Sequence, residues 1–205
     1  MRGPRDPSAT ASPAKGEEAR QAAAQAIEAF LRAIGYEISG ELVGTGRRVA
    51  DAWVDELVCG EGSDAAAILR AGALDMGSGP HSVVVLRDVA IATMCPHHLL
   101  PSHGRATIGY LPARLAAGLG AIAQAADACS RRLCLQESLG EAIVSALTRG
   151  LEAHGAFCKL ELVHTCFSAR GERQAGSIVE TLSLRGVFAE EKLDLALALA
   201  RPSRR

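Results

Sequence analysis

The sequence predicts an α+β protein, in which antiparallel strands form a sheet and helices pack on one of its faces. Two patterns carry this prediction. Apolar residues recur at helical spacing in the first third of the chain, and β-rich runs then occur in two pairs with two helical segments between them. With 205 residues, of which 48% are hydrophobic, the chain is long enough to bury a full core.

The N-terminal part of the chain divides into a tail and a helical segment. Residues 1–16 are rich in Pro, Ser, Ala and Gly and lack apolar periodicity, so we expect a disordered tail. Residues 17–72 are expected to form an N-terminal helical segment, because their apolar residues fall on helical faces. The predicted helices of this segment span residues 17–34, 46–57 and 65–71.

Residues 73–205 are expected to form the sheet domain. Short Val- and Ile-rich runs predict the strands, and longer Ala- and Leu-rich runs predict the helices. Strands are predicted at 83–86, 89–94, 107–111, 157–167 and 178–188, and helices at 118–133, 139–151 and 190–200.

The composition limits the partners and the compartment. Lys and Arg total 22 against 23 Asp and Glu, so the chain has no basic footprint for nucleic acid. No apolar run reaches the roughly 18 residues of a membrane helix, and the first residues contain no secretory core, so we expect no membrane partner and a cytoplasmic location. The six cysteines are then expected to be buried, metal-bound or catalytic rather than disulfide-bonded.

The strongest chemical signal is the run Cys95-Pro96-His97-His98. A thiolate and an imidazole three residues apart can reach one ion, and Zn²⁺ accepts both donors. The run Val163-His164-Thr165-Cys166 lies on a predicted strand, where side chains alternate, so His164 and Cys166 are expected to face the same side. One of them can supply a third ligand while the other acts nearby. On spacing alone, cysteines buried without a metal remain an open alternative.

Three segments carry a resemblance to a known family. CPHHLLPSHGRATIGYLP resembles the zinc-motif segment of GTP cyclohydrolase I and the strand that follows it. LCLQESL and LELVHTCFSARGERQAGSIVETLSLRGVF resemble two later segments of the same family, in the same order. Together the resemblance covers residues 45–190. It implies the T-fold, with a catalytic domain at 73–205, and assembly into a homo-oligomer, a toroidal decamer with active sites between subunits.

The resemblance also implies a role for individual residues. Zinc, the implied cofactor, would be held by Cys95, His98 and Cys166. His97 would transfer protons beside the zinc-activated water, and His164 would lie close to the reacting purine and phosphates. The substrate-binding residues would be Gln136 and Glu137 at the guanine edge, Arg170 at the triphosphate, and Leu119 and Leu135. For Glu137 alone, an ordinary first-turn carboxylate that stabilises its helix is the alternative.

The implied reaction converts GTP and water into 7,8-dihydroneopterin triphosphate and formate, on a route to tetrahydrofolate or another pterin. The sequence departs from the family where the triphosphate is held: Gly120, Ala121 and Gln124 stand in place of the usual Ser, Lys and Arg, and Pro96 replaces a Glu. Two alternatives therefore stay open. One is a cyclohydrolase for another purine with fewer or no phosphates, and the other is a non-catalytic T-fold subunit.

Overall fold

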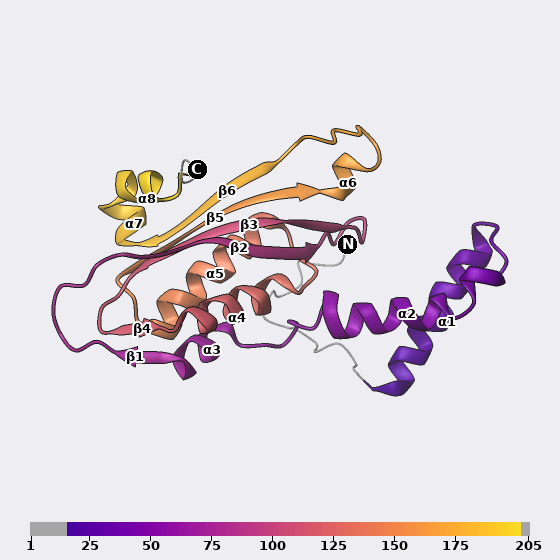
Figure 1. Cartoon of the computed structure of the whole chain (residues 1–205), viewed down its shortest axis with the longest axis horizontal. Coiled ribbons are helices and arrows are strands. Elements are labelled where there is room, and N and C mark those ends of the chain that lie inside the picture. Colours follow the sequence, from indigo (N-terminus) through magenta and orange to yellow (C-terminus); the bar gives the residue numbers. More distant parts are fainter. Residues whose placement is uncertain (1–15, 202–205) are drawn as a thin grey trace, which may run out of the picture. The chain divides into compact units, whose positions relative to one another are not determined.

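The computed structural model describes residues 16–201 (Figure 1), so the tail expected at residues 1–16 lies, except for Gly16, outside the described residues. The described chain forms two compact units that divide between Gly62 and Ser63. Within residues 16–201, no helix combines the length and the apolar character that a membrane crossing requires.

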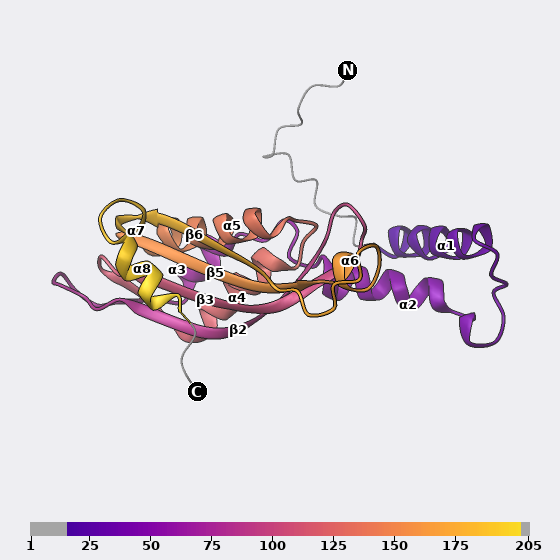
Figure 2. The ribbon, with the colours of Figure 1, turned by 90° about the horizontal axis from the view of Figure 1, so that it is seen from above.

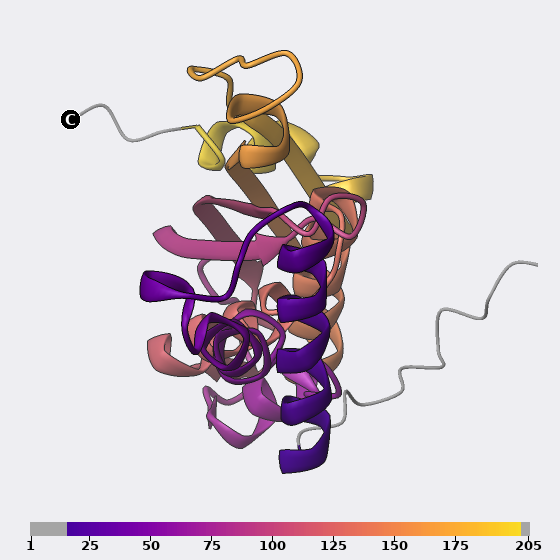
Figure 3. The ribbon, with the colours of Figure 1, turned by 90° about the vertical axis from the view of Figure 1, so that its right-hand side faces the viewer.

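The first unit is a pair of helices. Helix α1 (Glu17–Ala33) packs beside α2 (Thr45–Ala52), which continues into the π-helical turn η2 (Trp53–Leu57), and the 3-10 turn η1 (Gly40–Leu42) lies in the connection (Figures 2 and 3). A Cβ atom on Gly46 would lie 2.4 Å from the Ala24 carbonyl oxygen, so this close approach of the two helices requires glycine. The helices predicted at 17–34 and 46–57 are confirmed, and the second one ends in a π-helical turn.

Ion pairs join the two helices of this unit. Arg20 lies 3.0 Å from Asp51 and 2.6 Å from Asp55. Arg47 also pairs with Asp51, at 2.8 Å, and with Glu17. Hydrogen bonding from Arg47 and Arg20 lowers the pKa of Asp51. Because these groups are at the surface, the pairs contribute little to the free energy of unfolding.

The second unit contains a four-stranded antiparallel sheet in the order β2-β3-β5-β6 (Figure 1). Its strands are β2 (Val84–Met94), β3 (Pro101–Leu111), β5 (Gly155–His164) and β6 (Val179–Gly186). The two predicted strand pairs therefore join in one sheet, and the α+β prediction is confirmed. A small second sheet pairs β1 (Ala73–Asp75) with β4 (Leu115–Ala117). These strands of three residues were not predicted, because so few residues carry no periodicity.

Strand β2 joins two runs that the sequence separates. The register against β3 shifts between Leu86 and Val89, and Asp88 has a φ of 56°. One extra residue on β2 forms a β-bulge, which accommodates the charged Arg87–Asp88 pair without ending the strand. The sequence predicted a break at this point because a charged pair interrupts the apolar pattern.

Helices α3 (Ala65–Ala71), α4 (Leu119–Ser130) and α5 (Gln136–Leu151) pack on one face of the sheet (Figures 1 and 2). Alternate residues of β5 face these helices, and their side chains are fully buried: Ala156, Cys158, Leu160 and Leu162. The sequence placed α3 with the N-terminal helical segment. In the structure its buried Ala65 and Leu69 belong to the core of the sheet unit, because α3 packs on α4 and α5.

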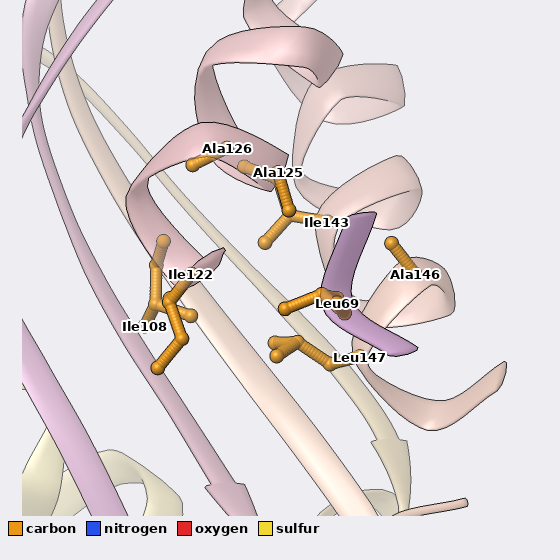
Figure 4. Close-up of a pocket in the computed structure, with 8 residues that line it drawn as sticks. All are labelled: Leu69, Ile108, Ile122, Ala125, Ala126, Ile143, Ala146 and Leu147. Carbon is orange, nitrogen blue, oxygen red and sulfur yellow. The ribbon is translucent and has the colours of Figure 1, made fainter. Parts of the chain in front are cut away.

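The opposite face of the sheet is covered at one end by the C-terminal helices α7 (Val187–Glu190) and α8 (Leu193–Leu199). The rings of Phe157 and Phe188 meet edge to face there, with centroids 5.2 Å apart. The predicted strand 178–188 ends earlier, at Gly186, whose φ of 60° turns the chain into α7. The main core also encloses a cavity of about 10 Å³ (Figure 4), lined by Leu69, Ile108, Ile122, Ala125, Ala126, Ile143, Ala146 and Leu147.

Candidate metal centre and its surroundings

The candidate metal centre is the cluster formed by Cys95, His98 and Cys166. One ligand atom of each residue lies within 4.8 Å of those of the other two, and the Cys95 Sγ and His98 Nδ1 atoms are 3.8 Å apart. Ligand atoms around a tetrahedral Zn²⁺ lie about 3.5–3.8 Å apart, given bonds of about 2.0–2.3 Å. Small side-chain adjustments would thus bring all three atoms onto one ion.

A tight turn between β2 and β3 positions Cys95 and His98. The Leu99 amide donates to the Cys95 carbonyl at 2.9 Å, and the Cys95 amide donates to the Leu100 carbonyl at 3.0 Å. Pro96 lacks an amide hydrogen, but the turn does not use one at that position. The departure at Pro96 therefore leaves the turn intact. Cys95 is buried, whereas His98 is exposed at the surface of the turn.

Cys166 reaches the cluster from a short helix and not from a strand. Strand β5 ends at His164, and Cys166 lies in α6 (Thr165–Ser168). The predicted strand 157–167, and with it the alternation argument for His164 and Cys166, is wrong at this point. The Thr165 hydroxyl donates to the Pro101 carbonyl at 2.6 Å, which ties α6 to the start of β3 and turns the chain out of the sheet.

The electrostatic surroundings of Cys166 favour its protonated form. Burial and the neighbouring Cys95 raise the pKa of the Cys166 thiol, whereas Arg170 opposes that shift. Two thiolates side by side repel each other unless a cation lies between them. A divalent ion would reverse the balance, because a coordinated thiol loses its proton. The donor set, two sulfurs and one imidazole nitrogen, fits Zn²⁺, and these three residues would hold it with a fourth position left for water.

His164 occupies the end of β5 beside the cluster, with both ring nitrogens engaged. Its Nδ1 lies 2.9 Å from the Ser102 hydroxyl and its Nε2 lies 2.7 Å from the Gln136 side-chain oxygen. Burial lowers the pKa of His164, and the carboxylate of Glu137 partly offsets this shift. Glu137 is exposed, whereas Gln136 is only 3% exposed.

The start of α5 is held next to this histidine by backbone pairing. Residues after α4 return to the end of β2, where the Cys134 amide donates to the Met94 carbonyl at 3.2 Å. The Thr93 hydroxyl donates to the Arg132 carbonyl at 3.1 Å. The loop anchored in this way leads directly into Gln136, the first residue of α5. The predicted helix at 139–151 thus begins three residues earlier than expected.

The structure brings most of the predicted site residues to one end of the sheet. His97 is exposed, and its ring meets that of His98 edge to face at 6.3 Å between centroids. Arg170 is exposed in the loop after α6 and acts electrostatically on Cys166. Leu135 directly precedes Gln136 and is 43% exposed.

Leu119 lies apart from this group. It begins α4, whereas residues just beyond the other end of α4 pair with Met94 beside the cluster. The 12 residues of α4 correspond to about 18 Å. Leu119 is 63% exposed, so its side chain faces away from the core of its own chain.

Sequence reasoning missed Ser102. This serine follows the motif by four residues and carries no pattern of its own, since a lone Ser in a strand is common. Its position becomes meaningful only through the β3–β5 register, in which Ser102 pairs directly with His164. Ser102 is 1% exposed.

The sheet with helices packed on one face, together with the Cys–His–Cys cluster at its end, defines an α+β protein with a candidate metal centre of two sulfurs and one imidazole nitrogen. The sequence model of the GTP cyclohydrolase I family matches residues 23–200. The chain belongs to this family, and it is thereby an enzyme of the GTP cyclohydrolase I type with the T-fold, a hydrolase acting on carbon–nitrogen bonds.

Curated relatives agree with this membership. The chain is 38% identical over 166 residues to a GTP cyclohydrolase 1 of Leifsonia xyli subsp. xyli, covering 80% of this chain and 86% of the relative. It is 37% identical over 167 residues to one of a Synechococcus strain, covering 81% and 72%. For one of Bacillus subtilis the identity is 32% over 169 residues, covering 82% and 87%.

Proposed function

We propose that this chain is a zinc-dependent cyclohydrolase that opens the purine ring of GTP, converting GTP and water into 7,8-dihydroneopterin triphosphate and formate. The observation that carries the proposal is the convergence of Cys95, His98 and Cys166 in a chain whose relatives are named GTP cyclohydrolase 1. The described part of the chain offers this single group of three or more potential ligands.

The three ligands would hold Zn²⁺ by two sulfurs and one nitrogen. Zn²⁺ with three protein ligands supplies Lewis acidity and an activated water at neutral pH. The exposed His97 is free of the core and sits against His98, so its imidazole can carry protons between solvent and the purine ring nitrogens. His164, at the end of β5 two residues before Cys166, would face the reacting end of the substrate.

Purine selection is assigned to Glu137. Its exposed carboxylate lies at the first turn of α5, and it can accept hydrogen bonds from the N–H groups of guanine. Adenine would leave that acceptor unpaired, which disfavours it. The Gln136 side chain is hydrogen-bonded inside the protein, so of this pair only Glu137 has an exposed side chain that could contact a ligand. Arg170 would bind phosphate as an exposed cation near Cys166.

A complete site would require a second copy of the chain. Leu119 is separated from the cluster by the length of α4, so one copy does not present both to the same ligand. A homo-oligomer, in the form of the decamer that the family resemblance implies, would bring Leu119 of one copy to the metal cluster of another. The proposal places this assembly in the cytoplasm, where its thiols stay reduced.

The second candidate is a cyclohydrolase that acts on a purine with fewer phosphates or none. The observation that favours it is helix α4, Leu119–Ser130, which contains no Lys or Arg. Charge-assisted hydrogen bonds contribute about 1.5–3 kcal/mol each, so the loss of two cations would lower the affinity for a triphosphate by about two to four decades.

The deciding experiment incubates the zinc-loaded full chain with GTP, GMP, guanosine and guanine. Formate release and the fluorescence of the oxidised pterin product are measured together. Turnover of GTP with one formate per pterin supports the main proposal, and a clear preference for a substrate with fewer phosphates selects the second candidate. Stoichiometric zinc without ring opening of any purine would leave a non-catalytic T-fold subunit. A Glu137→Ala variant should raise KM with its zinc content unchanged.

A further inference from the structure

Ser102 has no role in the proposed reaction, yet its hydroxyl group is a hydrogen-bond partner of the His164 ring. Both nitrogens of this imidazole are engaged: Nδ1 with the Ser102 hydroxyl at 2.9 Å, and Nε2 with the Gln136 side-chain oxygen at 2.7 Å. A neutral imidazole has one nitrogen that donates and one that accepts. The two partners therefore decide which nitrogen carries the proton.

The orientation of the Gln136 amide follows from its other contacts. Its nitrogen lies 3.0 Å from the Val179 carbonyl, 3.3 Å from the Leu160 carbonyl and 3.1 Å from the Thr181 hydroxyl. Backbone carbonyls only accept, so the group facing them must be the NH₂ and not the oxygen. A reversed amide would set its oxygen against two carbonyl oxygens in a buried site. The Gln136 oxygen thus faces His164.

That oxygen can only accept, so His164 must donate from Nε2. The proton of the neutral ring then resides on Nε2, and Nδ1 is left as an acceptor for the Ser102 O–H. We propose that Ser102 and Gln136 are positioning residues that hold His164 as the Nε2–H tautomer. In this tautomer the unprotonated Nδ1 accepts a hydrogen bond from the Ser102 hydroxyl. The catalytic part of this inference rests on the proposed function, in which His164 faces the substrate.

The fold explains why Ser102 can do this. Ser102 and His164 are direct partners in the β3–β5 ladder, where opposite side chains on one face lie about 4.5–5.5 Å apart at Cβ. A side chain as short as serine then fits between the strand and the ring. Ser102 and Gln136 are 1% and 3% exposed, so bulk water does not compete for either partner of the imidazole. A buried pair of this kind fixes both the ring plane and the tautomer.

Nitrogen NMR of the histidine ring tests the inference directly. The zinc-loaded full chain is labelled with ¹⁵N-histidine at about pH 8, where an imidazole is neutral, and the His164 signals are assigned from a His164→Gln variant. We expect a protonated Nε2 and an unprotonated, hydrogen-bonded Nδ1. In Ser102→Ala, the ¹⁵N chemical shift of Nδ1 should move to the value of an imidazole nitrogen that accepts no hydrogen bond. Its kcat should fall about 10-fold or more, with KM changed less than about 2-fold and zinc content unchanged.

Ser183→Ala is the matched control, since Ser183 is a buried serine on the helix-covered face of β6. It should leave the His164 signals and kcat unchanged. A protonated Nδ1 in the unaltered chain would overturn the inference, as would a Ser102→Ala variant with unchanged kcat and Nδ1 signal, or an equal loss in Ser183→Ala. If the unaltered chain opens no purine ring, the proposed function fails, while the tautomer readout still decides the assignment of Ser102 and Gln136.

Discussion

The Sγ atom of Cys95 lies 3.8 Å from Nδ1 of His98 within a single turn between β2 and β3. This pair forms the part of the candidate metal centre that is local in sequence. Cys166 is the part that is not local, because it arrives from α6, at the far end of β5.

Replacing either cysteine should abolish metal binding. With two ligands left, Cys95→Ser and Cys166→Ser are each expected to purify with less than about one tenth of the zinc of the unaltered chain, since three protein ligands are the norm for a catalytic zinc. Metal analysis of the purified proteins measures this. Cys59→Ser is the matched control and should keep its zinc, because Cys59 lies outside the cluster. Full zinc in Cys166→Ser would remove Cys166 from the ligand set.

Replacing His97 should separate chemistry from metal binding. His97 is exposed and contacts the ring of His98 without belonging to the cluster, so His97→Ala is expected to retain zinc. Loss of a proton-transfer group lowers kcat by about 10²–10⁴-fold. Steady-state kinetics beside metal analysis measure both effects. The matched control is His103→Ala, an exposed histidine on β3. Equal rates in the two variants would show that His97 carries no proton in the reaction.

The cavity beneath the helices predicts a stability effect. Leu147 lines the cavity of about 10 Å³ (Figure 4) and is 1% exposed. Leu147→Ala enlarges an apolar space that stays dry, so we expect the free energy of unfolding to fall by about 3–5 kcal/mol. Urea denaturation measures it. Leu197→Ala, at a side chain 44% exposed on α8, should change it by about 0.5 kcal/mol at most.

The buried thiols predict a pattern of reactivity. Burial raises the pKa of Cys129 to about 11, and it also raises the pKa of the Cys158 thiol. At pH 8 about one Cys129 thiol in a thousand is ionised, so alkylation of the folded protein should be very slow. Mass spectrometry after a timed iodoacetamide pulse measures it. Fast modification of Cys158 in folded protein would contradict its burial.

The ion pair between Asp75, at the end of β1, and Arg114 predicts a change in the pKa of Asp75 when the charge of Arg114 is removed. Arg114, by its hydrogen bonds to the carboxylate, and then the Gly77 amide lower the pKa of Asp75 to about 2. A lowered pKa in the folded state means that this stabilisation is present above the unfolded pKa, about 3.9, and is lost as the pH falls through about 2. Arg114→Gln should raise the Asp75 pKa, as followed by carboxyl ¹³C NMR. An unchanged titration would show that Gly77 alone suffices.

Local pattern was sufficient for much of the fold. The helices predicted at 17–34, 65–71 and 139–151 correspond to α1, α3 and α5, although α5 begins three residues earlier than predicted. The Cys95–His98 pair was visible because both residues share one turn. Two features were predicted wrongly for physical reasons that spacing cannot express. Charged residues inside β2 were accommodated by a bulge, and the strand through Cys166 was cut short by the Thr165 hydrogen bond to Pro101.

By itself, the sequence determined that the chain is an α+β member of its family with a cysteine and histidine pair suited to metal. Only the tertiary structure decided which distant groups join that pair. Cys166 reaches Cys95, and Ser102 meets His164 across 62 residues, through the β3–β5 register. The reason is that pairing between strands far apart in sequence depends on how the whole sheet buries its face, and no local pattern records that choice.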